Sequence, residues 1–123
     1  MPVRVIDASA LAALVFNEPD ADRVLGDIAR GSLAAPHLIA TELASVCLKK
    51  IRAHPEDRAA YIAAFDLLNQ MNIELMPISL DEAIALAEAT NLSIYDACYL
   101  WLALSLKCEL LTLDKKLASV SLH

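Results

Sequence analysis

Glycine is nearly absent from this 123-residue sequence, which has only Gly26 and Gly31. The sequence contains neither the G-x-G-x-x-G nor the G-x-x-x-x-G-K loop, and this argues against the nucleotide-binding folds that need those loops. Alanine and leucine, by contrast, occur 22 times each. This balance favours a helix-rich fold, because both residues are strong helix formers and glycine is a poor one.

Paired cysteines and long apolar runs are also missing. Cys47, Cys98 and Cys108 are odd in number and form no C-x-x-C pair, so we expect buried, reduced thiols in a cytoplasmic protein. The first residues show no basic-then-apolar leader, so we expect no signal peptide. The longest apolar-looking run, residues 97–106, is too short to span a bilayer, and we expect no membrane contact.

Apolar residues are abundant and make up 58% of the sequence. That fraction excludes disorder and leaves apolar surface for a partner. The net charge of −6 is unusual for a protein that binds nucleic acid. Acidic residues gathered around one site would account for much of it, and a divalent ion would reverse the field there.

The apolar periodicity predicts strands that alternate with helices. We expect buried strands at residues 3–6 and 72–78, further strands at 33–35 and 109–113, and a short last strand at 120–122. Helices are expected at residues 8–16, 21–30, 37–52, 56–69, 80–89, 93–106 and 114–119. This order predicts one α/β domain over residues 1–123, with a parallel sheet of about four or five strands and helices on both faces.

Two acids follow predicted strands. Asp7 ends the first strand, and Asp114 follows Leu110-Leu111-Thr112-Leu113. In open α/β sheets ligands bind beyond the carboxyl ends of the strands, so both positions favour a site. Each acid also precedes a helix, and either alone is well explained as a helix N-cap.

Two further acids lie on helices. Glu42 is on or beside an apolar helix face, where a carboxylate is costly unless it is paired or binds a metal; the alternative is a border position that reaches solvent. Asp96 completes a capping-box pattern with Ser93, yet its helical neighbours are mostly apolar. It is therefore expected to point inward near a helix N-terminus.

Together the four acids are expected to converge on one pocket. Carboxylates without Cys or His ligands suit hard ions such as Mg²⁺ or Mn²⁺, which activate water for phosphodiester cleavage. Mutual repulsion should raise the pKa of at least one carboxyl group above about 4. Lys115 and Lys116 lie beside this site and are candidate RNA contacts.

Four motifs in order resemble those of the PIN-domain ribonucleases. They are Val5-Ile6-Asp7-Ala8-Ser9-Ala10-Leu11, Pro36 through Thr41-Glu42-Leu43, Ile94-Tyr95-Asp96-Ala97, and Leu111-Thr112-Leu113-Asp114-Lys115-Lys116-Leu117. Their spacing covers essentially the whole chain, and the short length resembles VapC-type toxins of toxin–antitoxin pairs. Lys115-Lys116 departs from the family pattern, which has another acid or Asn after the last Asp.

The resemblance implies a Mg²⁺-dependent endoribonuclease that forms a homodimer and is inhibited by a protein antitoxin. Mn²⁺ would be able to replace Mg²⁺. Asp7 and Asp96 would be the core metal ligands, and Glu42 and Asp114 would complete the acidic cluster. Ser9 and Thr112 match family positions whose hydroxyl groups would orient the carboxylates.

Three other functions compete with this one. A phosphoacceptor receiver domain needs adjacent acids after the first strand, and Asp7 has no acidic neighbour. A haloacid-dehalogenase-type phosphatase needs D-x-D, but position 9 is Ser. The stronger alternative is a PIN-like RNA-binding or complex subunit with little or no turnover.

Overall fold

Four parallel strands form the centre of the molecule. The structure, a computed structural model, describes residues 2–121. Its sheet has the order β3-β2-β1-β4. The strands are β1 (Val3–Ile6), β2 (Ser32–Pro36), β3 (Ile73–Met76) and β4 (Leu110–Leu111). Because every neighbouring pair is parallel, the carboxyl ends of all four strands lie at one edge of the sheet.

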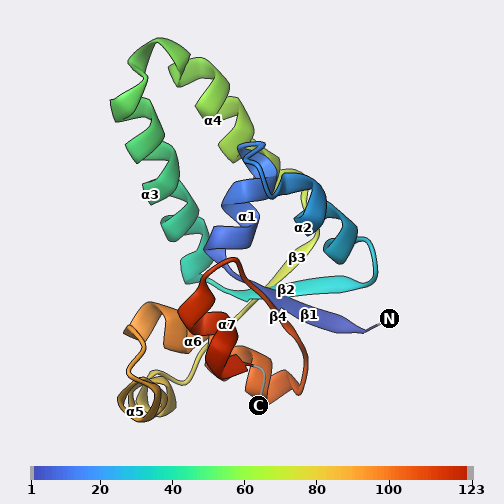
Figure 1. Cartoon of the computed structure of the whole chain (residues 1–123), viewed down its shortest axis with the longest axis vertical. Coiled ribbons are helices and arrows are strands. Elements are labelled where there is room, and N and C mark those ends of the chain that lie inside the picture. The colour runs from blue at the N-terminus through green and yellow to red at the C-terminus, as the bar shows by residue number, and fades with distance from the viewer. Residues whose placement is uncertain (1, 122–123) are drawn as a thin grey trace.

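Helices cover both faces of this sheet (Figure 1). The helices in chain order are α1 (Ala8–Val15), α2 (Ala21–Ile28), α3 (Leu38–Ala53), α4 (Arg58–Asp66), α5 (Leu80–Thr90), α6 (Ile94–Leu106) and α7 (Lys115–Ser121). Helices α1 and α2 lie on one face, whereas α5, α6 and α7 lie on the other. Helices α3 and α4 form a hairpin that rises away from the sheet. The predicted α/β class with a parallel, two-sided sheet is confirmed.

The core forms where the central strands meet α1, α3 and α6. Val5 and Ile6 of β1 are fully buried, because β1 has a strand on each side and helices above and below. Leu11, Leu43 and Leu102 bring the apolar faces of those three helices into the same cluster. No helix within residues 2–121 is both long and apolar enough to cross a membrane.

The structure corrects the predicted strands. Residues 72–78 do not form a buried strand: β3 is shorter and lies at an edge of the sheet, so Leu75 is 42% exposed. Strand β4 is limited to two residues. No strand forms at 120–121, since α7 continues to Ser121 and Val120 packs on the core one turn after the buried Leu117. Leu122 lies outside the described residues.

Two smaller predictions also need correction. The helix expected at 56–69 is divided into a 3-10 turn at Pro55–Asp57, α4, and a second 3-10 turn at Leu67–Gln70. Proline at the start sets this break, since it supplies no N–H to a preceding helical turn. Cys47 and Cys98 are buried as expected, but Cys108 is only partly buried.

Candidate active site

Asp7 lies at the carboxyl end of β1, in the middle of the sheet. It is the N-cap of α1: its Oδ1 accepts a hydrogen bond of 3.0 Å from the backbone N–H of Ala10. The capping interpretation therefore holds for this residue. It does not account for the second carboxylate oxygen, however, which takes part in a different set of contacts.

Two hydroxyl groups clamp the Asp7 carboxylate. Ser9 Oγ donates to Oδ1 at 2.7 Å, and Thr112 Oγ1 donates to Oδ2. Thr112 reaches Asp7 because β1 and β4 are in parallel register, with Ile6 beside Leu111. Ser9 Oγ in turn accepts from the backbone N–H of Leu113 at 2.9 Å. These bonds fix the carboxylate in one orientation.

Asp7 is only 3% exposed, and no ion pair to it occurs among residues 2–121. Burial raises the pKa of its carboxyl group above the ordinary value, and the hydrogen bonds from Thr112, Ala10 and Ser9 oppose that rise. A buried carboxylate that has hydrogen bonds but no cation keeps a strong attraction for one.

Glu42 lies in the first half of α3 and is partly buried. Its Oε1 accepts a hydrogen bond of 2.6 Å from the hydroxyl of Tyr99 on α6. Burial raises the pKa of Glu42; the Tyr99 hydrogen bond opposes this rise, and the charges of Asp96 and Asp7 add to it. This partly buried position matches the border position that the sequence analysis left open as the alternative.

Asp96 and Asp114 complete the set. The backbone N–H of Asp96 donates to Ser93 Oγ at 3.1 Å, so Ser93 caps α6 while the Asp96 carboxylate lies in the cleft. Burial raises the pKa of Asp96, with further contributions from the charges of Asp114 and Asp7. Asp114 accepts from the backbone N–H of Leu117 at 2.9 Å and so caps α7.

All four carboxylates line a single cleft of about 490 Å³. They come from four separate segments of the chain that meet at the carboxyl edge of the sheet. The other residues around the cleft are Ala8, Ser9, Thr41, Ser45, Val46, Lys49, Tyr95 and Tyr99. Three of the acids have a raised carboxyl pKa, as expected, but the largest cause is burial rather than mutual repulsion.

The basic residues near the site differ in whether they line the cleft. Lys115 and Lys116 are exposed and are not among the residues that line the cleft. Lys116 Nζ donates to the backbone oxygen of Asn91, and its charge weakly opposes the rise that burial causes in the pKa of Asp96. The lysine that lines the cleft is Lys49. It follows Glu42 by seven positions, or two helical turns, so helical spacing was a signal that could have found it.

Two tyrosines at the cleft were also missed. Tyr99 follows Asp96 by three positions, which places both on one side of α6. Tyr95 precedes Asp96 and is 58% exposed at the cleft. The sequence indicated only that Tyr99 was an apolar neighbour of Asp96, and gave no sign that its hydroxyl would reach α3.

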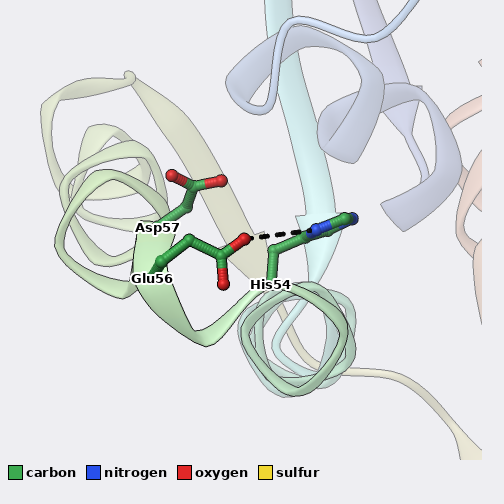
Figure 2. Close-up of side chains that lie close together, drawn as sticks. All are labelled: His54, Glu56 and Asp57. Atoms are coloured by element: carbon green, nitrogen blue, oxygen red, sulfur yellow. Dashed lines mark ion pairs between the residues drawn. The ribbon is translucent and has the colours of Figure 1, made fainter.

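A second acidic cluster lies at the tip of the α3–α4 hairpin. Figure 2 shows His54, Glu56 and Asp57, whose possible ligand atoms lie within 4.8 Å of one another. Among residues 2–121 this is the only group of at least three acidic, His or Cys side chains that is so close. All three residues are exposed, and His54 Nδ1 lies 3.6 Å from Glu56 Oε1. Within residues 2–121 the cleft carboxylates form no such close group, so they are spread more widely.

The donor atoms at the cleft fit a hard divalent cation. The candidate ligands are carboxylate and hydroxyl oxygens, with no thiol or imidazole among the lining residues. Oxygen donors of this kind suit Mg²⁺ and Mn²⁺. The fold and the cleft together define an α/β protein with an acidic site at the carboxyl edge of a parallel sheet.

Comparison with known proteins agrees with this description. The PIN domain family matches residues 4–122, so the chain belongs to the PIN-domain family. VapC ribonuclease Mb0985 of Mycobacterium bovis and ribonuclease VapC9 of Mycobacterium tuberculosis are each 34% identical to it over 115 residues. Those alignments cover 93% of this chain and 87% of each relative. The resemblance inferred from the four motifs is confirmed.

Two solved structures share the fold. The protein PAE2754 of Pyrobaculum aerophilum superimposes with a TM-score of 0.78 at 28% identity, over 96% of this chain and 85% of that one. VapC20 of Mycobacterium tuberculosis, described as a toxin that cleaves the sarcin–ricin loop, has a TM-score of 0.69 at 13% identity. That alignment covers 95% of this chain and 94% of VapC20. At that identity the second likeness is one of fold alone.

Proposed function

We propose that this protein is a metal-dependent endoribonuclease that hydrolyses RNA phosphodiester bonds at the acidic cleft. The observation that carries the proposal is the meeting of Asp7, Glu42, Asp96 and Asp114 in one cleft. Asp7 and Asp96 are the core metal ligands, and Glu42 and Asp114 complete the cluster. Membership of a family that includes proteins named VapC ribonucleases supports the same activity.

Mg²⁺ is the proposed cofactor, with Mn²⁺ as a substitute. When bound, such an ion supplies a water of lowered pKa and stabilises negative charge on the phosphate. The side chains of the protein supply orientation. Ser9 and Thr112 hold the Asp7 carboxylate, and Tyr99 holds that of Glu42, so these two ligands are already oriented when the ion arrives.

Lys49 and Tyr95 are the proposed RNA contacts at the cleft itself. Both line it, from α3 and α6 respectively, and Tyr95 is 58% exposed. A lysine contacts phosphate as a point charge, and an exposed aromatic ring stacks on an unpaired base. Lys115 and Lys116 stay candidates for contact with RNA that extends beyond the cleft.

We further propose that the chain is the toxin of a toxin–antitoxin pair, forms a homodimer and acts in the cytoplasm. The VapC ribonucleases that are 34% identical support the toxin role, and the exposed apolar side chains Leu80, Ile84 and Leu104 on α5 and α6 support a protein interface. Production of the chain without its antitoxin should slow bacterial growth, and production of Asp96→Asn should not. Equal growth inhibition by both would contradict the toxin proposal.

Cleavage of RNA in vitro tests the central proposal. Wild type should cleave with Mg²⁺ and should not cleave with EDTA, while Asp96→Asn should be inactive in both. Asp57→Asn at the hairpin tip is the matched control and should retain activity. If folded wild type binds RNA but does not cleave it with Mg²⁺ or Mn²⁺, the protein is instead an RNA-binding subunit.

A further inference from the structure

Tyr99 makes a contact whose position suits a role beyond packing. Its ring is buried in the core and is only 1% exposed. Its hydroxyl crosses from α6 to α3 and donates to Glu42 Oε1 at 2.6 Å, joining residues that are 57 positions apart. This is the one hydrogen bond that the Glu42 side chain makes within residues 2–121, so Oε2 is left for the cleft.

We propose that Tyr99 is a positioning residue for divalent-cation binding, and that it acts through Glu42 rather than by contact with the ion. The inference rests on the proposed function, because it takes the acidic cleft to be the metal site. By holding Oε1, the Tyr99 hydroxyl restricts the Glu42 side chain to an orientation that presents its carboxylate to the cleft.

Two physical reasons favour this role over simple packing. A phenylalanine would fill the same apolar space, and a buried hydroxyl is retained at low cost only where it finds a partner. A long glutamate side chain also loses rotamer freedom when it binds an ion, and this loss opposes binding. A hydrogen bond that already fixes the carboxylate removes part of that cost.

The buried hydroxyl is also well suited to act as a donor. Burial, followed by the hydrogen bond and the negative charge of Glu42, raises the pKa of Tyr99 well above its usual range. In this pair the hydroxyl is the donor, because a carboxylate oxygen accepts. Support of a metal ligand by an outer hydrogen bond commonly changes metal affinity by about 10- to 100-fold.

Calorimetric titration with Mn²⁺ tests the proposal on the whole chain. Tyr99→Phe should weaken Mn²⁺ binding by roughly 10-fold, while its melting temperature in EDTA stays close to that of wild type. Tyr61→Phe is the matched control, because Tyr61 is a partly buried tyrosine on α4 whose hydroxyl has no hydrogen bond within residues 2–121. Its affinity should equal that of wild type.

A double variant separates positioning from packing. In Glu42→Gln the metal ligand is already lost, so adding Tyr99→Phe should weaken Mn²⁺ binding no further. A further loss of the same size in that background would show that Tyr99 acts through the core, and would overturn the proposal. Wild-type affinity in Tyr99→Phe would overturn it as well.

A measurement on the wild-type chain covers the case in which Tyr99→Phe does not fold. Tyrosine labelled with carbon-13 at Cζ gives one resonance for each of the three tyrosines, and the one that moves in Glu42→Gln is that of Tyr99. Saturating Mg²⁺ should shift this resonance, and no shift would overturn the proposal. Failure of wild type to bind Mn²⁺ at all would instead contradict the proposed function.

Discussion

The cleft at the sheet and the tip of the α3–α4 hairpin both gather acidic side chains, but they do so in different ways. At the tip, His54, Glu56 and Asp57 are close because they are near neighbours in the sequence, and all three are exposed (Figure 2). At the cleft, the acids come from four distant segments and are wholly or partly buried. In Figure 1 the tip lies at the far end of the hairpin from the sheet.

If the cleft is the metal site, as proposed, buried charge is a better sign of such a site than short distances between acids. Exposed carboxylates are solvated by water, so they gain little from an ion. Burial at the cleft raises the pKa of Asp7, Glu42 and Asp96, which means that their charged forms are held at a cost that a cation would offset. Substitutions in the two regions should therefore have very different effects.

The largest difference is expected in RNA cleavage. Asp7→Asn keeps the shape and the helix cap but removes the charge, and should lower Mg²⁺-dependent cleavage by at least about 100-fold. Glu56→Gln should leave the rate within about twofold of wild type, since exposed substitutions away from a site have little effect. Initial rates on a single-stranded RNA would give both values. Comparable losses in the two variants would remove the distinction between cleft and tip.

The next difference concerns stabilisation by metal. At about 100 times the dissociation constant, Mn²⁺ should stabilise wild type by roughly 2.7 kcal/mol, a rise in melting temperature on the order of 5–15 °C for a small domain. Asp96→Asn should show a much smaller rise, and the double variant Glu56→Gln/Asp57→Asn the full rise. Thermal melts in EDTA and in saturating Mn²⁺ measure this. An undiminished rise in Asp96→Asn would mean that its carboxylate is not a ligand.

A smaller effect is expected for the basic residue at the cleft. Lys49→Ala should weaken RNA binding and reduce the slope of log affinity against log salt by about one. Arg30→Ala is the control, because Arg30 lies at the opposite, amino-terminal edge of the sheet. Filter binding in Ca²⁺ at several salt concentrations gives the slopes. Equal slopes for Lys49→Ala and wild type would exclude a phosphate contact by Lys49.

The smallest effect is the pH dependence of stability without metal. Since burial raises the pKa of Asp7 in the folded state, the folded chain holds this proton more tightly than the unfolded chain. The contribution is complete below the unfolded pKa, about 4, and is lost as pH rises through the folded pKa. A tenfold difference in proton affinity between the folded and unfolded chains corresponds to about 1.4 kcal/mol of stability.

Asp7→Asn should therefore lose less stability than wild type between pH 4 and pH 8, and Glu56→Gln should follow wild type. Urea denaturation in EDTA across that range provides the curves. A wild-type curve that rises with pH relative to Asp7→Asn would have the opposite sign and would contradict the burial argument.

Much of the fold was predictable because its periodicity is strong. The β-branched run before Asp7 and the apolar spacing along residues 37–52 and 93–106 give β1, α3 and α6 within a residue or so. The local residue pattern does not show which strand lies at an edge. Ile73–Met76 has the composition of a buried strand, but the strand order leaves it with one neighbour. Val120 was misassigned because the short run Val120-Ser121-Leu122 fits a helix end equally well.

The four acids of the candidate site could be predicted from the sequence, but the side chains that contact them could not. Asp7 and Asp114 follow strands and precede helices, which a local pattern reveals. The contact of Tyr99 with Glu42 depends on how α6 crosses α3, and no local pattern carries that geometry. For the same reason Lys116, close to Asp114 in sequence, lies toward Asn91 while Lys49 reaches the cleft.

Locating Mn²⁺ in crystals of the wild-type protein by its anomalous scattering would test the central claim most directly. The account predicts a peak in the cleft, bound by the carboxylates of Asp7 and Asp96, and none at the hairpin tip. The same crystals of Asp96→Asn should show a weaker cleft peak or none. A peak at His54, Glu56 and Asp57 with an empty cleft would contradict the account.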